Sequence, residues 1–152
     1  MKKLFLILIL FVMALPVFSQ QRIARPFSRA QVLNEKYCSS LFASPDGEYF
    51  DLLDEGTNIA AISYLNILDW LQGRVAGLRV FTTRDLVRIP FIRNALATVY
   101  IDEVRVSYDY LNLLPVSDIA MVKVIKGSFV GNPGAAAGAI AIYTIQGDDE
   151  ED

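Results

Sequence analysis

The sequence has no histidine and a single cysteine, Cys38, among its 152 residues. Histidine is the most common metal ligand among side chains and the usual general base at neutral pH, so its absence argues against a zinc site and most acid–base chemistry. One cysteine cannot form an internal disulfide. We interpret Cys38 as a small buried apolar residue, with a reactive or intermolecular thiol as the alternative.

Patterns that carry catalysis or nucleotide binding are also missing. No serine or threonine lies beside a candidate base, and the adjacent acids Asp102 and Glu103 would point to opposite faces of a strand. The glycine-rich stretch 131–138 lacks the lysine and hydroxyl residue that end a phosphate-binding loop. The acidic run 148–152 lacks the turn glycine of a calcium loop. The sequence therefore predicts no enzyme, no cofactor and no metal site.

Neither sign of charge dominates the body of the chain. The formal net charge is −3, and residues 148–152 are all acidic, which predicts a solvated tail. With this tail and the two N-terminal lysines set aside, basic and acidic residues are equal in number. No basic surface is expected, and therefore no nucleic-acid partner.

The first residues have the features of an export signal. A positively charged start precedes the apolar run 4–18, and Val17 and Ser19 are small enough for signal-peptidase cleavage before Gln20. As a helix the run would span about 22 Å, less than the ~30 Å hydrocarbon core of a bilayer. The sequence predicts a signal peptide over 1–19, with a retained membrane anchor as the alternative.

The segment 20–57 shows little regular pattern. Residues 20–36 are polar with scattered apolar positions, which predicts an extended or partly ordered lead-in. Residues 44–57 combine turn dipeptides with several acids, which predicts a loop. The organised part begins at Thr57 or Asn58, either of which can cap a helix.

A helical period follows this segment. Apolar residues recur every three residues, which predicts one helix that buries a single face. Gly73 would end this helix in the left-handed conformation, which glycine adopts without a steric cost. The predicted stripe consists of Ile59, Ile62, Leu65, Leu68 and Leu71, widened by Ile67 and Trp70.

Strand-like segments make up the rest of the organised part. Pro90 lacks an N–H group, so the strand 86–93 is expected at an edge or with a bulge, where it could pair with a partner strand. Asp102 and Glu103 are a tight turn or kink, and a helical turn that begins at Pro115 is expected within 111–119. The last strand is mostly apolar and should be central. The predicted strands are 78–82, 86–93, 97–106, 120–126 and 139–145.

These elements predict an α+β fold, a small mixed β-sheet with short helices packed on one face. Arg74 and Arg79 could present a basic surface, but a helix end followed by a strand start is the favoured interpretation of that segment. Function would then lie on the loops. The residues predicted to share one core are Ile67, Leu71, Val122, Val124 and Ile142.

Four segments carry a family resemblance: "ILDWLQGRVAGLRV" (67–80), "VYIDEVRV" (99–106), "LLPVSDIAMVKVIKG" (113–127) and "GAAAGAIAIYTIQG" (134–147). In order and spacing they resemble the plug domain of TonB-dependent outer-membrane receptors of the Bacteroidetes type, over residues 58–147. The "FSQQ" after the apolar run also resembles a Bacteroidetes export signal. The resemblance implies structural motif roles for Leu71, Gln72, Gly73, Arg74, Val75, Gly77, Ile101, Asp102, Asp118, Ile119, Val124, Lys126, Gly127, Gly138 and Ile142.

The sequence departs from the family pattern at three places. Asn94 stands where a glycine is expected, Glu103 replaces the glycine of an Asp-Gly turn, and the stretch 130–138 lacks the arginine of the usual connection. A plugged transporter also needs about 22 strands of about ten residues, more than this chain offers. The chain is thus expected to be a plug without its barrel.

The resemblance implies an exported plug-like binding or structural module on the periplasmic side of the outer membrane, unable to transport alone. The expected partner is an outer-membrane β-barrel or another envelope protein, and no membrane span is expected after signal cleavage. The alternative is a fragment or degenerate relative of a full nutrient receptor that works with a separate barrel chain. Residues 20–36 contain no convincing energy-coupling box, which favours the autonomous module.

Overall fold

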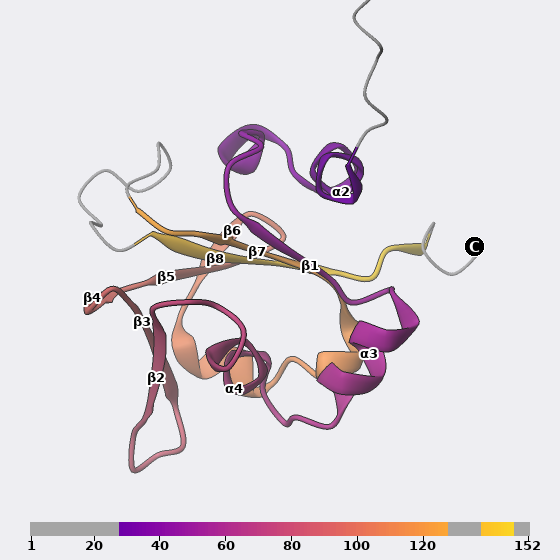
Figure 1. The fold of residues 1–152 in the computed structure, drawn as a ribbon. Helices are drawn as coiled ribbons and strands as arrows, with labels where there is room; N and C mark the ends of the chain where they lie inside the picture. The colour runs from indigo at the N-terminus through magenta and orange to yellow at the C-terminus, as the bar shows by residue number, and fades with distance from the viewer. Residues whose placement is uncertain (1–27, 128–137, 148–152) are drawn as a thin grey trace, which may run out of the picture.

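The computed structural model describes residues 28–127 and 138–147 (Figure 1). The predicted signal peptide, the glycine-rich connection before Gly138 and the acidic tail lie outside these residues. The described helices are α2 (Arg29–Tyr37), α3 (Glu55–Ile62) and α4 (Ile67–Gln72), with the 3₁₀ helices η2 (Ser40–Phe42), η3 (Tyr108–Asn112) and η4 (Val116–Asp118). The described strands are β1 (Glu48–Asp51), β2 (Leu78–Thr82), β3 (Arg88–Ile92), β4 (Ala95–Leu96), β5 (Thr98–Ile101), β6 (Val104–Val106), β7 (Ile119–Ile125) and β8 (Ala139–Thr144).

The fold is α+β, as the sequence predicts. The main sheet has the strand order β1-β7-β8-β5-β6. It is mixed, because β8 pairs antiparallel with β7 and parallel with β5. Nearly every residue of β7 and β8 is buried, which confirms that the apolar last strand is central. A second, smaller sheet has the order β2-β3-β4, and its β2–β3 hairpin extends away from the main sheet beside α4 (Figure 1).

Each face of the main sheet has its own core. One core lies on the side of α4 and contains all five residues predicted to pack together. On the opposite face, Leu33 and Tyr37 of α2 and Phe42 of η2 pack with Tyr143 and with small residues of β7 and β8. The prediction of helices on one face is therefore wrong, since α2 covers the face opposite α3 and α4 (Figure 1).

Helix α2 lies in the segment predicted as an extended or partly ordered lead-in, and the extended alternative is wrong for the described residues. Ser28 Oγ accepts the N–H of Gln31, and the Gln31 side chain accepts the N–H of Ser28, which together form a capping box. Only Leu33 and Tyr37 of this helix are buried. Two buried positions are too few for a helical period to stand out in the sequence.

A buried lysine holds the segment after α2 on the sheet. The Lys123 side chain on β7 is inaccessible to solvent. Its Nζ donates to Asn34 Oδ1 (2.7 Å) and to the carbonyl oxygens of Phe42 (2.6 Å) and Ser44 (2.5 Å), and it lies 4.9 Å from the centroid of the Tyr49 ring. Burial lowers the pKa of Lys123. The three oxygens offset part of the cost of burying the ammonium group.

Strand β1 and the start of α3 occupy the region predicted as a loop, so that prediction is wrong as well. β1 pairs antiparallel with β7, and its Glu48 forms an ion pair with Lys126. Asp54 caps α3 by accepting the N–H of Thr57 at 3.1 Å, so the predicted caps Thr57 and Asn58 lie inside the helix. All four residues of β1 are only half-buried, which is why their acidic composition resembles that of a loop.

The single helix predicted after Thr57 is two helices. α3 ends at Ile62, and Asn66 caps α4 by accepting the N–H of Leu68 at 3.0 Å. The second half of the predicted stripe is buried, but Ile59, Ile62 and Leu65 are 62%, 50% and 89% exposed. The continuous stripe is therefore a wrong prediction, because the break at the Asn66 cap turns the first half away from the core.

Gly73 ends helix α4, as the sequence predicts, but the backbone conformation there differs from the prediction. Gly73 has φ −81°, in the right-handed region, so its predicted left-handed conformation is wrong. The left-handed glycine is Gly77, with φ +83°, directly before β2. Its carbonyl oxygen accepts the N–H of Arg93 at 3.0 Å and so closes the end of the β2–β3 hairpin.

Pro90 lies in β3, the middle strand of the small sheet, and β3 pairs without a bulge, so the prediction of an edge or bulged strand at 86–93 is wrong. Hydrogen-bonded and non-hydrogen-bonded residue pairs alternate along an antiparallel hairpin. Counted from the hydrogen bonds at the two ends of this hairpin, Val80 and Pro90 form a pair without hydrogen bonds between β2 and β3. The ring nitrogen of Pro90 therefore faces β4. On that side, the Pro90 carbonyl accepts the N–H of Ala97 (3.0 Å), while the Ala97 carbonyl accepts the Tyr108 hydroxyl (2.8 Å). The proline thus costs no bond between β2 and β3.

Asp102 and Glu103 form the predicted tight turn between β5 and β6, with φ +46° and +65°. They therefore do not lie on opposite faces of a strand. The Asp102 carboxylate accepts the N–H and hydroxyl of Thr144 (2.9 and 2.8 Å). The Glu103 carboxylate accepts the N–H and hydroxyl of Ser39 (2.6 and 2.9 Å). These bonds stabilise both residues in a left-handed backbone conformation, which glycine adopts more easily.

The predicted helical turn before β7 is present as η3 and η4. Pro115 is the N-cap of η4 rather than its first helical residue. Leu111 and Val116 are buried and attach this connection to the core on the α4 side.

Three tyrosines, of which Tyr143 is buried and Tyr49 and Tyr108 are half-buried, predict a loss of stability at alkaline pH. Burial raises the pKa of Tyr49 from 10 to about 12, and it also raises the pKa values of Tyr108 and Tyr143. A phenol with a raised pKa in the folded state stabilises that state below its unfolded pKa, and this contribution is lost as pH rises through the folded pKa. We expect the stability advantage of the wild type over Tyr49→Phe to shrink between pH 10 and 12, measured by urea unfolding. A constant difference would contradict this assignment.

Candidate binding surface

Most of the residues that the family resemblance marks lie in the scaffold. Arg74 donates to the Trp70 carbonyl oxygen at 2.9 Å, and its guanidinium lies 4.3 Å from the centroid of that indole ring. The Asp118 carbonyl accepts the N–H of Ile145 at 2.9 Å, and Ile101 is half-buried at the end of β5. The marked residues with buried apolar side chains all belong to the core on the α4 side, and they are Leu71, Val75, Ile119, Val124 and Ile142.

Two marked glycines lie side by side at one end of the main sheet. Gly127 follows β7 with φ +143°, and Gly138 precedes β8 with φ +91°. A Cβ atom on Gly138 would lie 1.9 Å from the carbonyl oxygen of Ile125 and 2.8 Å from the Gly127 nitrogen. The close approach of the two backbones therefore requires glycine at position 138.

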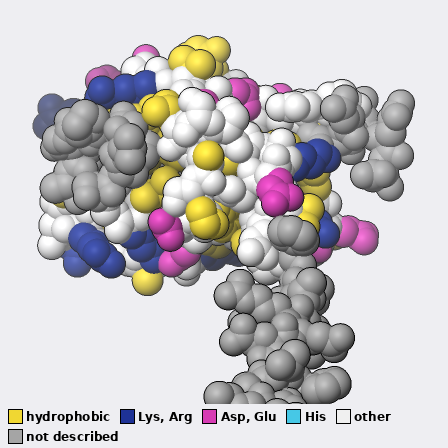
Figure 2. All heavy atoms as spheres, turned by 90° about the horizontal axis from the view of Figure 1, so that it is seen from above, with side chains coloured by type: hydrophobic (Ala, Val, Ile, Leu, Met, Phe, Trp, Pro, Cys, Tyr) yellow, Lys and Arg dark blue, Asp and Glu magenta, His cyan; other side chains and the backbone are white. Residues whose placement is uncertain are grey.

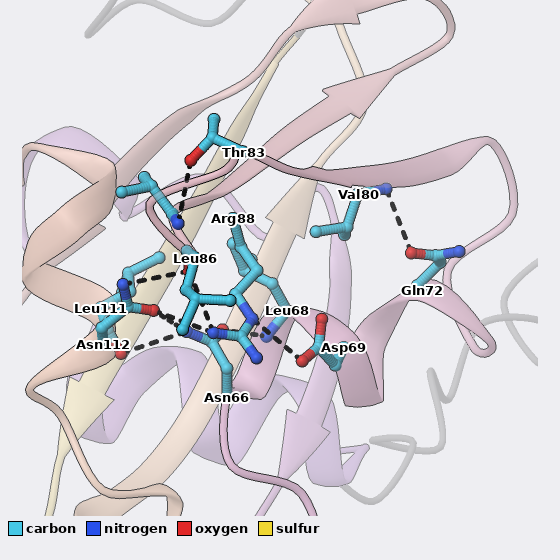
Figure 3. A network of polar contacts seen from close by, with 11 residues as sticks. Asn66, Leu68, Asp69, Gln72, Val80, Thr83, Leu86, Arg88, Leu111 and Asn112 are labelled. Carbon is cyan, nitrogen blue, oxygen red and sulfur yellow. Dashed lines mark hydrogen bonds and ion pairs between the residues drawn. The ribbon is translucent and has the colours of Figure 1, made fainter.

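A polar network attaches the small sheet to the rest of the domain (Figure 3). Arg88 Nε donates to Asp69 Oδ2 of α4 at 3.1 Å. Arg88 Nη1 donates to Asn112 Oδ1 of η3 (3.2 Å) and to the Leu86 carbonyl oxygen (3.1 Å). Asn66 Nδ2, at the start of α4, also donates to Asn112 Oδ1, at 3.2 Å. Arg88 thus joins the small sheet, α4 and η3 at one point.

Removal of Arg88 should loosen the small sheet. The Arg88 and Asp69 side chains are 19% and 34% exposed, so Arg88→Ala leaves the partly buried Asp69 carboxylate without a donor and leaves Asn112 Oδ1 with the Asn66 amide alone. We expect a loss of about 1–3 kcal/mol in the free energy of unfolding and faster hydrogen exchange in β2 and β3. Arg84→Ala, at an exposed arginine of the same hairpin, is the control and should stay within about 0.5 kcal/mol of wild type. Equal effects of both changes would contradict the role of Arg88.

The network leaves the outer face of the small sheet open to solvent. A shallow groove of about 450 Å³ on this face is lined by Arg79, Phe81, Ile89, Phe91 and Asn94. We call it the small-sheet groove. Phe81 and Phe91 pack edge to face with their ring centroids 5.3 Å apart, yet Phe81 remains 57% exposed. Asn94 lies in the β3–β4 turn with φ +68°, a conformation that asparagine tolerates where the family pattern has glycine.

Phe81 is one of several exposed large apolar side chains, and it differs from the face seen from the side of α2 in belonging to an aromatic pair. Seen from the side of α2, hydrophobic side chains form small separate groups among charged and polar ones (Figure 2). Single exposed apolar residues of that kind are normal in soluble domains. An aromatic pair in an open groove is a candidate binding surface instead.

From the sequence, a basic surface at Arg79 is the less favoured interpretation, and nothing singles out Phe81 or Phe91. The signal was present in the alternation of β2, where Arg79 and Phe81 are two residues apart and so share a face. The side of the sheet on which they lie depends on pairing with β3 (Arg79↔Phe91 and Phe81↔Ile89), which sequence alone does not provide.

Within residues 28–127 and 138–147, no group of three or more His, Cys, Asp or Glu side chains is placed to hold a metal ion. Cys38 is half-buried, and burial raises the pKa of its thiol, which disfavours the reactive thiolate. No helix in this part of the chain has the length and hydrophobicity to cross a bilayer. The small-sheet groove is the candidate binding surface because it holds an aromatic pair that is open to solvent.

A scan against protein-family models finds no match, and a search of curated proteins finds none either. Among solved structures, 66% of the chain matches 12% of a chain of the RagAB peptide importer in its open-open state, with a TM-score of 0.51 and 21% identity. A second RagAB peptide transporter structure matches over 67% of this chain and 13% of its own, with a TM-score of 0.50 and 24% identity.

A mutant of the ferric enterobactin receptor PfeA from Pseudomonas aeruginosa, solved with enterobactin, is similar as well. It matches 68% of this chain and 18% of its own, with a TM-score of 0.51 and 19% identity. The chain thus corresponds to less than a fifth of the length of each of these proteins. At such identities the similarity shows the fold alone, and that fold is one found in a region of TonB-dependent receptors, as the sequence resemblance implies.

Proposed function

We propose that this chain is an exported plug-like module that binds another envelope protein at the periplasmic side of the outer membrane, and that it acts by binding rather than catalysis. The observation that carries the proposal is the small-sheet groove. Both faces of the main sheet are covered by packed side chains, whereas the groove presents Phe81 and Phe91 to solvent. An open apolar surface rimmed by polar groups is typical of an interaction site.

The envelope location has two supports. The first 19 residues have the pattern of an export signal. The solved structures that share the fold are parts of an importer and of a ferric enterobactin receptor. We therefore propose an outer-membrane β-barrel, or another envelope protein, as the partner. The described residues form a packed domain, and no transport activity is proposed for this domain by itself.

Co-purification from the cell envelope tests the proposal. The tagged chain would be expressed in its source cells, the envelopes gently solubilised, and the bound proteins identified by mass spectrometry. We expect an envelope protein in stoichiometric amount with wild type, and about tenfold less of it with Phe81→Ser, as befits an aromatic residue at the centre of an interface. Leu65→Ser is the control, since Leu65 is 89% exposed and lies outside the groove.

Two results would overturn the proposal. The first is recovery of the chain alone from the soluble periplasmic fraction. The second is an equal loss of the co-purified protein in the two variants, because the groove would then not be the contact surface.

A further inference from the structure

Part of the edge of β2 beside the groove is already hydrogen-bonded within the chain. Along the hairpin, the backbone groups of Leu78 and Val80 point away from β3, where an added strand would pair with them. Both N–H groups are already bonded within the chain. The Leu78 N–H donates to the Val75 carbonyl oxygen at 3.1 Å, and the Val80 N–H donates to Gln72 Oε1 at 3.2 Å (Figure 3). These bonds disfavour strand addition along this edge and favour a partner on the face of the sheet, in the groove.

Arg79 is the charged residue among those that line the groove. Its side chain is exposed and has no hydrogen bond or ion pair with another residue of the described part of the chain. A partner that packs on Phe81 and Phe91 would lie beside this guanidinium. An anionic group of the partner at that point would complement its charge, whereas a cationic group would be repelled.

We propose that the small-sheet groove binds a protein segment that places a carboxylate beside an aromatic or aliphatic side chain, the carboxylate on Arg79 and the apolar side chain against Phe81 and Phe91. This inference rests on the proposed function, to which it adds the chemistry of the partner. A protein segment fits better than a small molecule, since the groove is shallow and open whereas small-molecule sites enclose their ligands.

The geometry of β2 sets the spacing in the partner. Arg79 and Phe81 are two residues apart on one strand, about 6.7 Å along the sheet. An extended partner would match them with an acidic residue two positions from an apolar one. A helical partner would match them with the same pair three or four positions apart, since such residues are neighbours on a helix.

Selection from a random peptide library tests this chemistry even while the natural partner is unidentified. Phage-displayed random decapeptides would be selected on the exported chain and on its Arg79→Glu variant. Wild type should enrich peptides with Asp or Glu near Phe, Leu or Ile. Arg79→Glu should enrich Lys or Arg in their place and bind the wild-type peptides about tenfold more weakly. Arg105→Glu, an exposed arginine on β6 in the other sheet, is the control and should keep the acidic preference.

Three outcomes would overturn this inference. One is an acidic preference that survives Arg79→Glu. The second is a wild-type selection that yields no peptides, and the third is one that yields the same peptides on Phe81→Ser, with both proteins shown to be folded by circular dichroism. None of these outcomes depends on envelope co-purification, so the proposed location and the proposed partner chemistry can fail separately.

Discussion

Val124→Asp is expected to abolish cooperative unfolding of this domain. Val124 is completely buried in β7, where its backbone pairs with Ile140 of β8 on one side and Glu48 of β1 on the other. A carboxylate at this position would be surrounded by apolar side chains of the core on the α4 side. The cost exceeds about 4 kcal/mol, comparable with the whole stability of a small domain at about 5–15 kcal/mol.

Thermal and urea unfolding followed by circular dichroism measure this effect. Val104→Asp is the matched control, since Val104 is 65% exposed on β6. The control should unfold within about 0.5 kcal/mol of wild type. A cooperative, native-like transition in Val124→Asp would show that the core assignment is wrong.

Gly138→Ala should also destabilise the domain strongly, by at least about 3 kcal/mol. Two effects add at this position. The backbone has φ +91°, which a residue with a Cβ atom rarely adopts, and that Cβ would lie 1.9 Å from the Ile125 carbonyl oxygen. Relief of the clash would separate the ends of β7 and β8, the two most buried strands of the sheet.

Gly73→Ala provides the comparison for this second change. Gly73 has φ −81°, and a Cβ there would meet no atom within 4 Å. Alanine at position 73 should therefore be neutral or slightly stabilising, because it lowers the conformational entropy of the unfolded chain. Equal free energies of unfolding for the two variants would show that Gly138 is not under the constraint described.

The elements that could be predicted from sequence are those whose pattern is determined locally. The strands β7 and β8 are continuous apolar runs, as expected for strands covered on both faces. The turn at Asp102 and Glu103 was visible as a polar interruption between two apolar runs. The shared core of Ile67, Leu71 and Val124 followed from the same patterns.

The elements that could not be predicted depend on distant partners. Helix α2 buries only Leu33 and Tyr37, and it is held in place through Lys123, a residue far along the chain. The stripe of Ile59 to Leu71 gave no sign of the break before Asn66, because both halves keep the same spacing. Such cases show tertiary contacts overriding a local pattern.

The candidate site was the least predictable feature. Arg79, Phe81 and Phe91 come together only through the register of β2 on β3. Pro90 made β3 look like an edge strand, although the proline nitrogen faces the short strand β4 and leaves the β2–β3 pairing intact. A one-residue change in register would turn the phenylalanines inward, so composition alone could not locate the groove.

Photo-crosslinking in living cells tests the central claim most directly, because it reports which protein touches the groove in its native setting. A photo-crosslinking amino acid would replace Phe81 in the groove and, in a separate strain, Leu65 outside it. We predict that light produces an adduct with an envelope protein from position 81 and none from position 65. No adduct from position 81, or adducts of equal yield from both positions, would contradict the claim that this face binds a partner.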